Sequence, residues 1–163
     1  MIERIQWRGH SSIVIQGTPY IHIAPWRVAK SLFHPDLILI GHDHYDHCSQ
    51  ADVEKIRGET TQIIGNKHVA EIISDTTIIR EWQSMSIDNV SIKAIPAYSP
   101  NDSRHPKNDQ GLGFVISLDF YDIYYTYQAH QKGRKNKVIP LPVLHYSLGD
   151  GALNEDWDVN RKA

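Results

Sequence analysis

The sequence predicts an α/β fold, and three observations support this prediction. Short apolar runs recur along the chain and are typical of buried strands, residues 36–40 (Asp-Leu-Ile-Leu-Ile) being the clearest example. Patterns typical of a helix start follow two of these runs, at Ser49 and at Asn66. Strands that alternate with helices in the central part of the chain favour α/β layering over an all-β barrel.

The N-terminal part of the chain predicts an antiparallel meander. Its three strands are expected at residues 3–8, 11–16 and 20–23, with Gly17-Thr18-Pro19 as the second turn. His10 lies in the first turn. His22 shares a strand face with Tyr20 and Ala24, and we interpret it as a structural residue.

The remainder of the chain predicts two helices and further strands. After an amphipathic link at 28–33 and the strand at 36–40, we expect helices at 51–57 and 67–73 and strands at 61–64, 77–80, 91–95, 114–118 and 122–125. We expect the strand at 91–95 to face a sheet edge. The last two strands form a hairpin, and the polar segment 99–113 is too long for a tight turn, which favours a functional role.

The composition is that of an ordinary globular protein. With 163 residues, 40% of them hydrophobic and 22% charged, the chain predicts a single domain over residues 1–163. A net charge of −2 with mixed signs predicts no basic face, so nucleic acid is not a favoured partner. No apolar run reaches the roughly 18 residues needed to span a membrane. The N-terminus lacks a secretion pattern, and the single cysteine, Cys48, suits a reducing cytoplasm.

The densest chemical feature is the segment 41–49, Gly-His-Asp-His-Tyr-Asp-His-Cys-Ser. It contains four potential metal ligands, namely His42, His44, Asp46 and His47. A single histidine in a polar loop is often merely solvated, but four ligand-type residues on one strand-to-helix turn predict a metal site. Imidazole and carboxylate together suit zinc, manganese or iron. Cys48 is a soft ligand, a reactive thiol or simply a small packed residue, and we favour the last interpretation.

The H-x-H-x-D-H pattern after a hydrophobic strand resembles the ligand motif of the metallo-β-lactamase-fold hydrolases. Other stretches resemble the small prokaryotic branch near the ascorbate-6-phosphate lactonase-like proteins. Residues 7–12 (WRGHSS) are similar to its W-L-G-H-x-S, residues 21–26 (IHIAPW) to its I-x-I-D-P-W, and residues 95–98, 105–107 and 111–114 to its V-P-A-Y-N … H-P-K-G-x-G-x-G-Y. The resemblance is close over residues 2–126, so we treat 1–126 as family-like and 127–163 as divergent.

The resemblance implies a metallo-β-lactamase-like αββα sandwich whose second half is incomplete, by truncation or internal deletion. Full-length members have one more strand–helix unit, of about 30 residues, before the last ligand motif. The implied activity is that of a metal-dependent hydrolase acting on a small-molecule substrate. A water activated by one or two zinc ions, with Mn²⁺ or Fe²⁺ as alternatives, would attack an ester, lactone or phosphodiester.

The resemblance also implies a ligand set. His105 would complete a three-histidine site with His42 and His44, and His145 would join Asp46 and His47 at a second ion. Asp46 would hold the nucleophile as well as the second ion. The turn that contains His10 lies near the metal centre in this family, although a turn histidine bonded to the backbone is an equal alternative.

Two positions depart from the family pattern. Ala24 stands where relatives carry an aspartate beside the metal site, and such carboxylates orient ligand histidines. Gln128 falls where an aspartate bridges the two ions, and a neutral amide does not offset their mutual repulsion. The alternative function is therefore a catalytically impaired, metal-binding homologue that acts as a binding or interaction module. A missing layer would leave apolar sheet surface exposed, which suggests a homo-oligomer.

Overall fold

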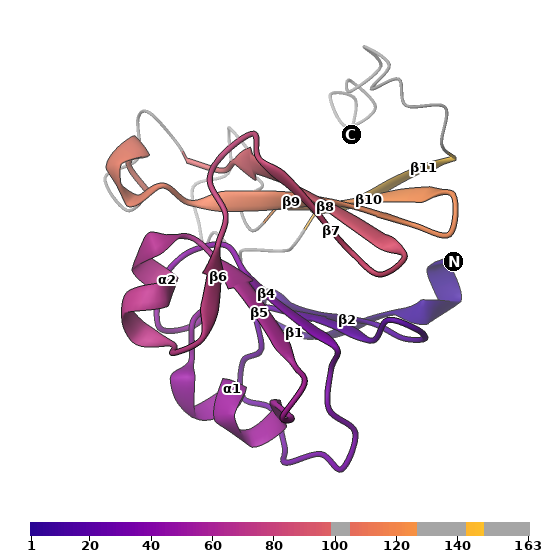
Figure 1. The fold of residues 1–163 in the computed structure, drawn as a ribbon, viewed down its shortest axis with the longest axis horizontal. Helices are drawn as coiled ribbons and strands as arrows, with labels where there is room; N and C mark the ends of the chain where they lie inside the picture. Colours follow the sequence, from indigo (N-terminus) through magenta and orange to yellow (C-terminus); the bar gives the residue numbers. More distant parts are fainter. Residues whose placement is uncertain (99–104, 127–142, 149–163) are drawn as a thin grey trace, which may run out of the picture.

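The computed structural model describes residues 1–98 and 105–126, and the backbone of residues 143–148. Two sheets pack face to face (Figure 1). The six-stranded sheet contains, in spatial order, β1 (Ile5–Gly9), β2 (Ser12–Ile15), β3 (Ile21–Ile23), β4 (Leu37–Ile40), β5 (Gln62–Gly65) and β6 (Thr76–Ile78). The five-stranded sheet contains β11 (Val143–Leu148), β10 (Tyr121–Thr126), β9 (Leu112–Leu118), β8 (Val90–Pro96) and β7 (Ser84–Ile87). The helices are α1 (Gln50–Ile56) and α2 (Lys67–Ile72), with 3₁₀ turns η1 (Ile2–Arg4) and η2 (Lys107–Asp109).

The six-stranded sheet is mixed, and its parallel half places the candidate site. Strands β1, β2 and β3 form the predicted antiparallel meander. Strands β3 to β6 then run parallel to one another. Their carboxyl ends therefore meet at one edge of the sheet, where the loops that follow them can share a site. All pairings in the five-stranded sheet are antiparallel.

Strand β4 is buried on both faces, which explains its continuous apolar sequence. Leu37 and Leu39 belong to the core between the two sheets, together with residues such as Phe114. Ile38 and Ile40 belong to a second core beneath the helices. That second core also contains Val53 of α1, Val69 of α2 and the buried Cys48.

The layers therefore run helices, sheet, sheet, as Figure 1 shows. These are three of the four layers of the predicted αββα sandwich. Within residues 1–98 and 105–126, both α-helices pack on the six-stranded sheet, and none covers the outer face of the other sheet. No helix in the described part of the chain is long and apolar enough to cross a membrane.

Both predicted helix starts are confirmed. The Ser49 side chain accepts a hydrogen bond from the backbone N–H of Asp52 at the start of α1. The Asn66 side chain accepts one from the N–H of Val69 at the start of α2. Such caps accept from the backbone N–H groups of the first helical turn, and the Asp52 N–H also donates to the carbonyl oxygen of Ser49 at 3.1 Å.

Three expectations in the antiparallel parts of the chain were wrong. Residues 2–4 form η1, so that β1 begins only at Ile5. The chain contains a strand absent from the sequence prediction, β7, because the apolar–polar alternation in Ser-Met-Ser-Ile extends over only four residues. Strand β8 is consequently not at an edge, since it pairs with β7 on one side and β9 on the other. Its alternating burial reflects one core-facing and one outer face, a pattern that edge strands share.

Candidate metal centre

The loop between β4 and α1 carries the H-x-H-x-D-H residues and is held at both ends. At its start, the carbonyl oxygen of Gly41 accepts a hydrogen bond of 2.9 Å from the N–H of Leu112, which ties the loop to the second sheet. Farther along, the N–H groups of His47 and Cys48 both donate to the carbonyl oxygen of His44, each at 2.8 Å. The loop therefore presents its side chains from a fixed backbone at the carboxyl edge of the parallel strands.

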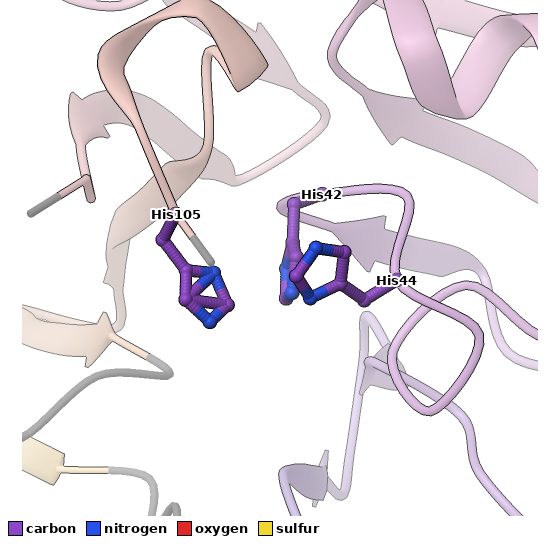
Figure 2. A group of neighbouring side chains, drawn as sticks. All are labelled: His42, His44 and His105. Atoms are coloured by element: carbon purple, nitrogen blue, oxygen red, sulfur yellow. The ribbon is translucent and has the colours of Figure 1, made fainter. Parts of the chain in front are cut away.

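His42, His44 and His105 form the first ligand group. One ring nitrogen from each lies within 4.8 Å of the other two. The ring centroids are 4.7 Å apart for His42 and His44, and 4.6 Å apart for His44 and His105. Figure 2 shows the three rings turned toward one another, two from the loop after β4 and one from the segment that leads into η2. The sequence-predicted set is thus brought together across the two sheets.

His10, Asp46 and His47 form the second ligand group, again with ligand atoms within 4.8 Å of one another. The Nε2 atom of His10 lies 3.1 Å from Oδ2 of Asp46, and Nε2 of His47 lies 3.9 Å from the same oxygen. The two groups are adjacent, because the rings of His42 and His47 are 4.2 Å apart between centroids. The structure therefore places two three-residue ligand groups side by side.

Burial keeps the central histidines neutral. Burial lowers the pKa of His42 far below its ordinary value, and the neighbouring His47 and His44 lower it further. For His47, burial lowers the pKa to about 4, although the Asp46 carboxylate acts in the opposite direction. Neutral imidazole is the form that binds metal ions, so these rings are ready to coordinate an ion at neutral pH. The donor set of imidazoles and one carboxylate fits zinc and other first-row divalent metals.

Three further residues named in the sequence prediction lie elsewhere in the chain. His145 lies in β11, where its backbone pairs with Tyr124, and its side chain is outside the described part. Gln128 also lies outside the described residues. Ala24 directly follows β3, is buried, and has a left-handed backbone with φ of 46°. Its N–H donates to the carbonyl oxygen of Leu39, which places it beside the strand that leads to His42.

Two further interpretations are confirmed. Cys48 is a packed residue, because its thiol is buried in the core beneath the helices and belongs to neither ligand group. Burial raises the pKa of this thiol to about 12, which makes it unreactive at neutral pH. His22 is structural, since it is buried with Nε2 at 2.9 Å from Oγ of Ser12.

The membership of His10 in the second group could not be assigned from residue spacing. From the sequence, this histidine is either a turn residue bonded to the backbone or a neighbour of the metal centre. The only signal in the sequence was its position in a stretch similar to the W-L-G-H-x-S motif. The structure places its ring against Asp46, a contact that depends on how the first turn of the meander faces the loop after β4.

An αβ sandwich with an H-x-H-x-D-H loop at the edge of its parallel strands defines the class of metallo-β-lactamase-type folds. A family model described as the beta-lactamase superfamily domain matches residues 4–151, and the chain belongs to this family.

Similar proteins agree with this assignment. The chain is 29% identical over 136 residues to a UPF0173 metal-dependent hydrolase of Thermococcus kodakarensis, a match that covers 76% of the chain and 60% of that relative. It is 30% identical over 129 residues to a UPF0173 metal-dependent hydrolase of Thermoplasma volcanium, with 71% and 56% covered. The chain thus spans less than two thirds of the length of these relatives.

Two solved structures show the same fold. A Parabacteroides distasonis protein, described as a metal-dependent hydrolase, matches with a TM-score of 0.67 at 22% identity, over 74% of this chain and 58% of that one. CmlA, a diiron β-hydroxylase from Streptomyces venezuelae, matches with a TM-score of 0.58 at 12% identity, over 74% of this chain and 28% of that one. At these identities the likeness concerns the fold alone.

Proposed function

We propose that this protein is a metal-dependent hydrolase of small-molecule substrates. The observation that carries the proposal is the convergence of His42, His44 and His105, from two segments far apart in the sequence, on one point between the sheets. Three imidazoles around one point are a ligand set of catalytic zinc sites, which leave a fourth position for water or substrate. The family membership and the metal-dependent hydrolases among its relatives support the same conclusion.

The proposed ligands are His42, His44 and His105 for one ion, with Asp46 and His47 for a second. A divalent ion held there would lower the pKa of a coordinated water to about 7 and polarise a carbonyl or phosphoryl oxygen. Asp46 is about one quarter exposed, so its carboxylate can accept a hydrogen bond from the attacking water and orient it. We therefore propose that Asp46 is the catalytic residue that orients the attacking water. His145 remains a predicted ligand of the second ion.

The proposed substrates are esters, lactones or phosphodiesters, since the same site chemistry serves all three. Zinc is the proposed metal because imidazole nitrogen and carboxylate oxygen suit it, with manganese and iron as alternatives. Iron stays among the proposed alternatives because one structural neighbour is a diiron enzyme. A cytoplasmic location and a homo-oligomeric state complete the proposal.

A second candidate is a metal-binding homologue that has lost turnover. Ala24 favours it, because a buried methyl group replaces a carboxylate that would support the ligands. The two candidates share metal binding and differ in catalysis.

The test begins with zinc content, measured by elemental mass spectrometry on protein purified without chelator. The double substitution His42→Ala and His44→Ala should abolish tight binding by the first ligand group. Unchanged zinc content in that variant would refute the ligand assignment. Lactone and phosphodiester substrates, assayed with the zinc-loaded wild-type protein, then separate the hydrolase from the homologue without turnover.

A further inference from the structure

We infer that His10 supplies the third protein ligand of the second metal ion, so that this ion is held by His10, Asp46 and His47. The inference rests on the proposed function, because it requires that the chain bind metal. It departs from the ligand set implied by the family resemblance, in which His145 takes this position. It assigns a ligand role to a turn of the N-terminal meander.

The distances within the second ligand group fit one ion. Two ligand atoms that each lie about 2.1 Å from a zinc ion at the tetrahedral angle are about 3.4 Å apart. The distances to Oδ2 of Asp46 are 3.1 Å from Nε2 of His10 and 3.9 Å from Nε2 of His47, one on either side of that value. The two rings meet edge to face, with centroids 5.0 Å apart. Small side-chain rotations therefore suffice for all three residues to contact the same ion.

The two ring nitrogens of His10 have different surroundings. One ring nitrogen, Nε2, faces Asp46, while Nδ1 is buried and has no hydrogen-bond partner among the described residues. Nε2 is therefore the ring nitrogen positioned to coordinate the second ion.

The backbone of the turn holds the ring in place. Gly9 and His10 both have positive φ, 108° and 52° respectively. A left-handed conformation is uncommon for a residue with a side chain, and such residues cluster at functional sites. The indole N–H of Trp7 donates a 2.8 Å hydrogen bond to the carbonyl oxygen of His10, which fixes the turn. The strained turn thus directs the His10 ring toward Asp46.

This assignment makes the second site independent of the C-terminal part of the chain. All three ligands come from the segment between the first turn of the meander and the loop after β4. A chain that spans less than two thirds of its relatives could therefore keep a complete pair of ligand groups. The second group supplies two imidazoles and one carboxylate, and the first group supplies three imidazoles.

The test is zinc stoichiometry in single variants of the 163-residue chain. Each protein is saturated with Zn²⁺, freed of loosely bound ion by gel filtration, and analysed by elemental mass spectrometry. His10→Asn is the main variant because asparagine tolerates positive φ, and His10→Gly is the second because glycine adopts it without strain. His68→Asn, on α2 and outside both ligand groups, is the matched control, and His145→Ala tests the competing ligand.

We expect two zinc ions in the wild type, the His68 control and His145→Ala, and one in both His10 variants. Two ions in the His10 variants, even if bound more weakly, would overturn the inference, because His10 would then only hydrogen-bond to Asp46. Loss of one ion in His145→Ala, with both retained in His10→Asn, would assign the position to His145. Both results leave the proposed function intact. A wild-type protein that binds no zinc would refute the proposed function as well.

Discussion

The ring centroids of His42 and His47 lie 4.2 Å apart, although His42 belongs to the first candidate ligand group and His47 to the second. Two divalent ions bound to these groups would be close neighbours and would repel each other strongly in a partly buried site. Among the described residues, the two candidate ligand groups include one carboxylate, Asp46, to offset that repulsion. A bridging carboxylate would therefore contribute more here than at an isolated ion.

The first prediction concerns Gln128, at the position where the family resemblance implies a bridging aspartate. Gln128→Asp should tighten binding of the second zinc ion by about tenfold or more, because it adds a negative charge between the ions. Competition titration with a zinc indicator measures the change. Gln128→Asn is the control, since it has the same size as aspartate and no charge. Equal affinities in the two variants would show that residue 128 does not reach the ions.

The second prediction concerns Ala24, which is 2% exposed and has φ of 46°. Ala24→Asp should strengthen zinc binding by about ten- to a hundredfold, the range typical of carboxylates that orient metal ligands. The backbone should accept the change, because aspartate tolerates left-handed φ better than alanine. Without metal the same variant should be less stable than the wild type, since it buries an uncompensated charge.

Zinc titration measures the change in affinity of Ala24→Asp, and thermal unfolding with and without zinc measures its change in stability. The control is Ala24→Asn, which keeps the shape and the tolerance of positive φ but lacks the charge. If the aspartate and asparagine variants bind zinc equally, a carboxylate at this position does not support the ligands.

The sequence was sufficient to predict the parts of the fold that local signals determine. Strand β4 is predicted by its continuous apolar run, because both of its faces are buried. Ser49 and Asn66 predict helix starts because their side chains cap the helices. Strand β7 carries a weaker signal, since serine alternates with Met85 and Ile87 over only four residues. Its absence from the prediction then misplaced β8 at an edge.

The candidate site also contains residues that local spacing predicts and residues that depend on tertiary contacts. His42, His44, Asp46 and His47 are local in sequence, so their spacing alone predicts a metal site. His105 is predicted only through the family resemblance, because nothing in the polar segment 99–113 indicates that its single histidine turns toward the loop after β4. His10 was left open for a related reason. Its contact with Asp46 depends on the packing of a strained turn against a distant loop, which no sequence periodicity encodes.

A third prediction concerns the helix that follows the ligand loop. The Oγ atom of Ser49 accepts a hydrogen bond of 3.3 Å from the N–H of Asp52, which caps α1 directly after His47 and Cys48. Ser49→Ala should lower the free energy of unfolding by about 1 kcal/mol, the typical cost of losing such a cap. Urea denaturation measures it, with Ser84→Ala, at an exposed position of β7, as the control. Equal stabilities of the two variants would show that the cap contributes nothing.

The last prediction is that acid destabilises the protein through His22. Burial, together with the nearby Arg8 and against the opposing effect of Asp52, lowers the pKa of this imidazole from 6.5 to about 4. Above pH 6.5 the ring is neutral in both the folded and the unfolded state. As the pH falls toward 4, the unfolded chain binds a proton that the folded protein does not, so the free energy of unfolding decreases.

The size of this effect follows from the shift in the pKa of His22, and it amounts to about 3 kcal/mol between pH 6.5 and pH 4. Urea denaturation across this range, in the presence of chelator so that metal release does not contribute, should show that His22→Gln loses less stability than the wild type by about this amount. His68→Gln, which removes a partly exposed histidine on α2, should follow the wild type. A His22→Gln variant with the same acid sensitivity as the wild type would mean that burial does not keep this ring neutral in the folded protein.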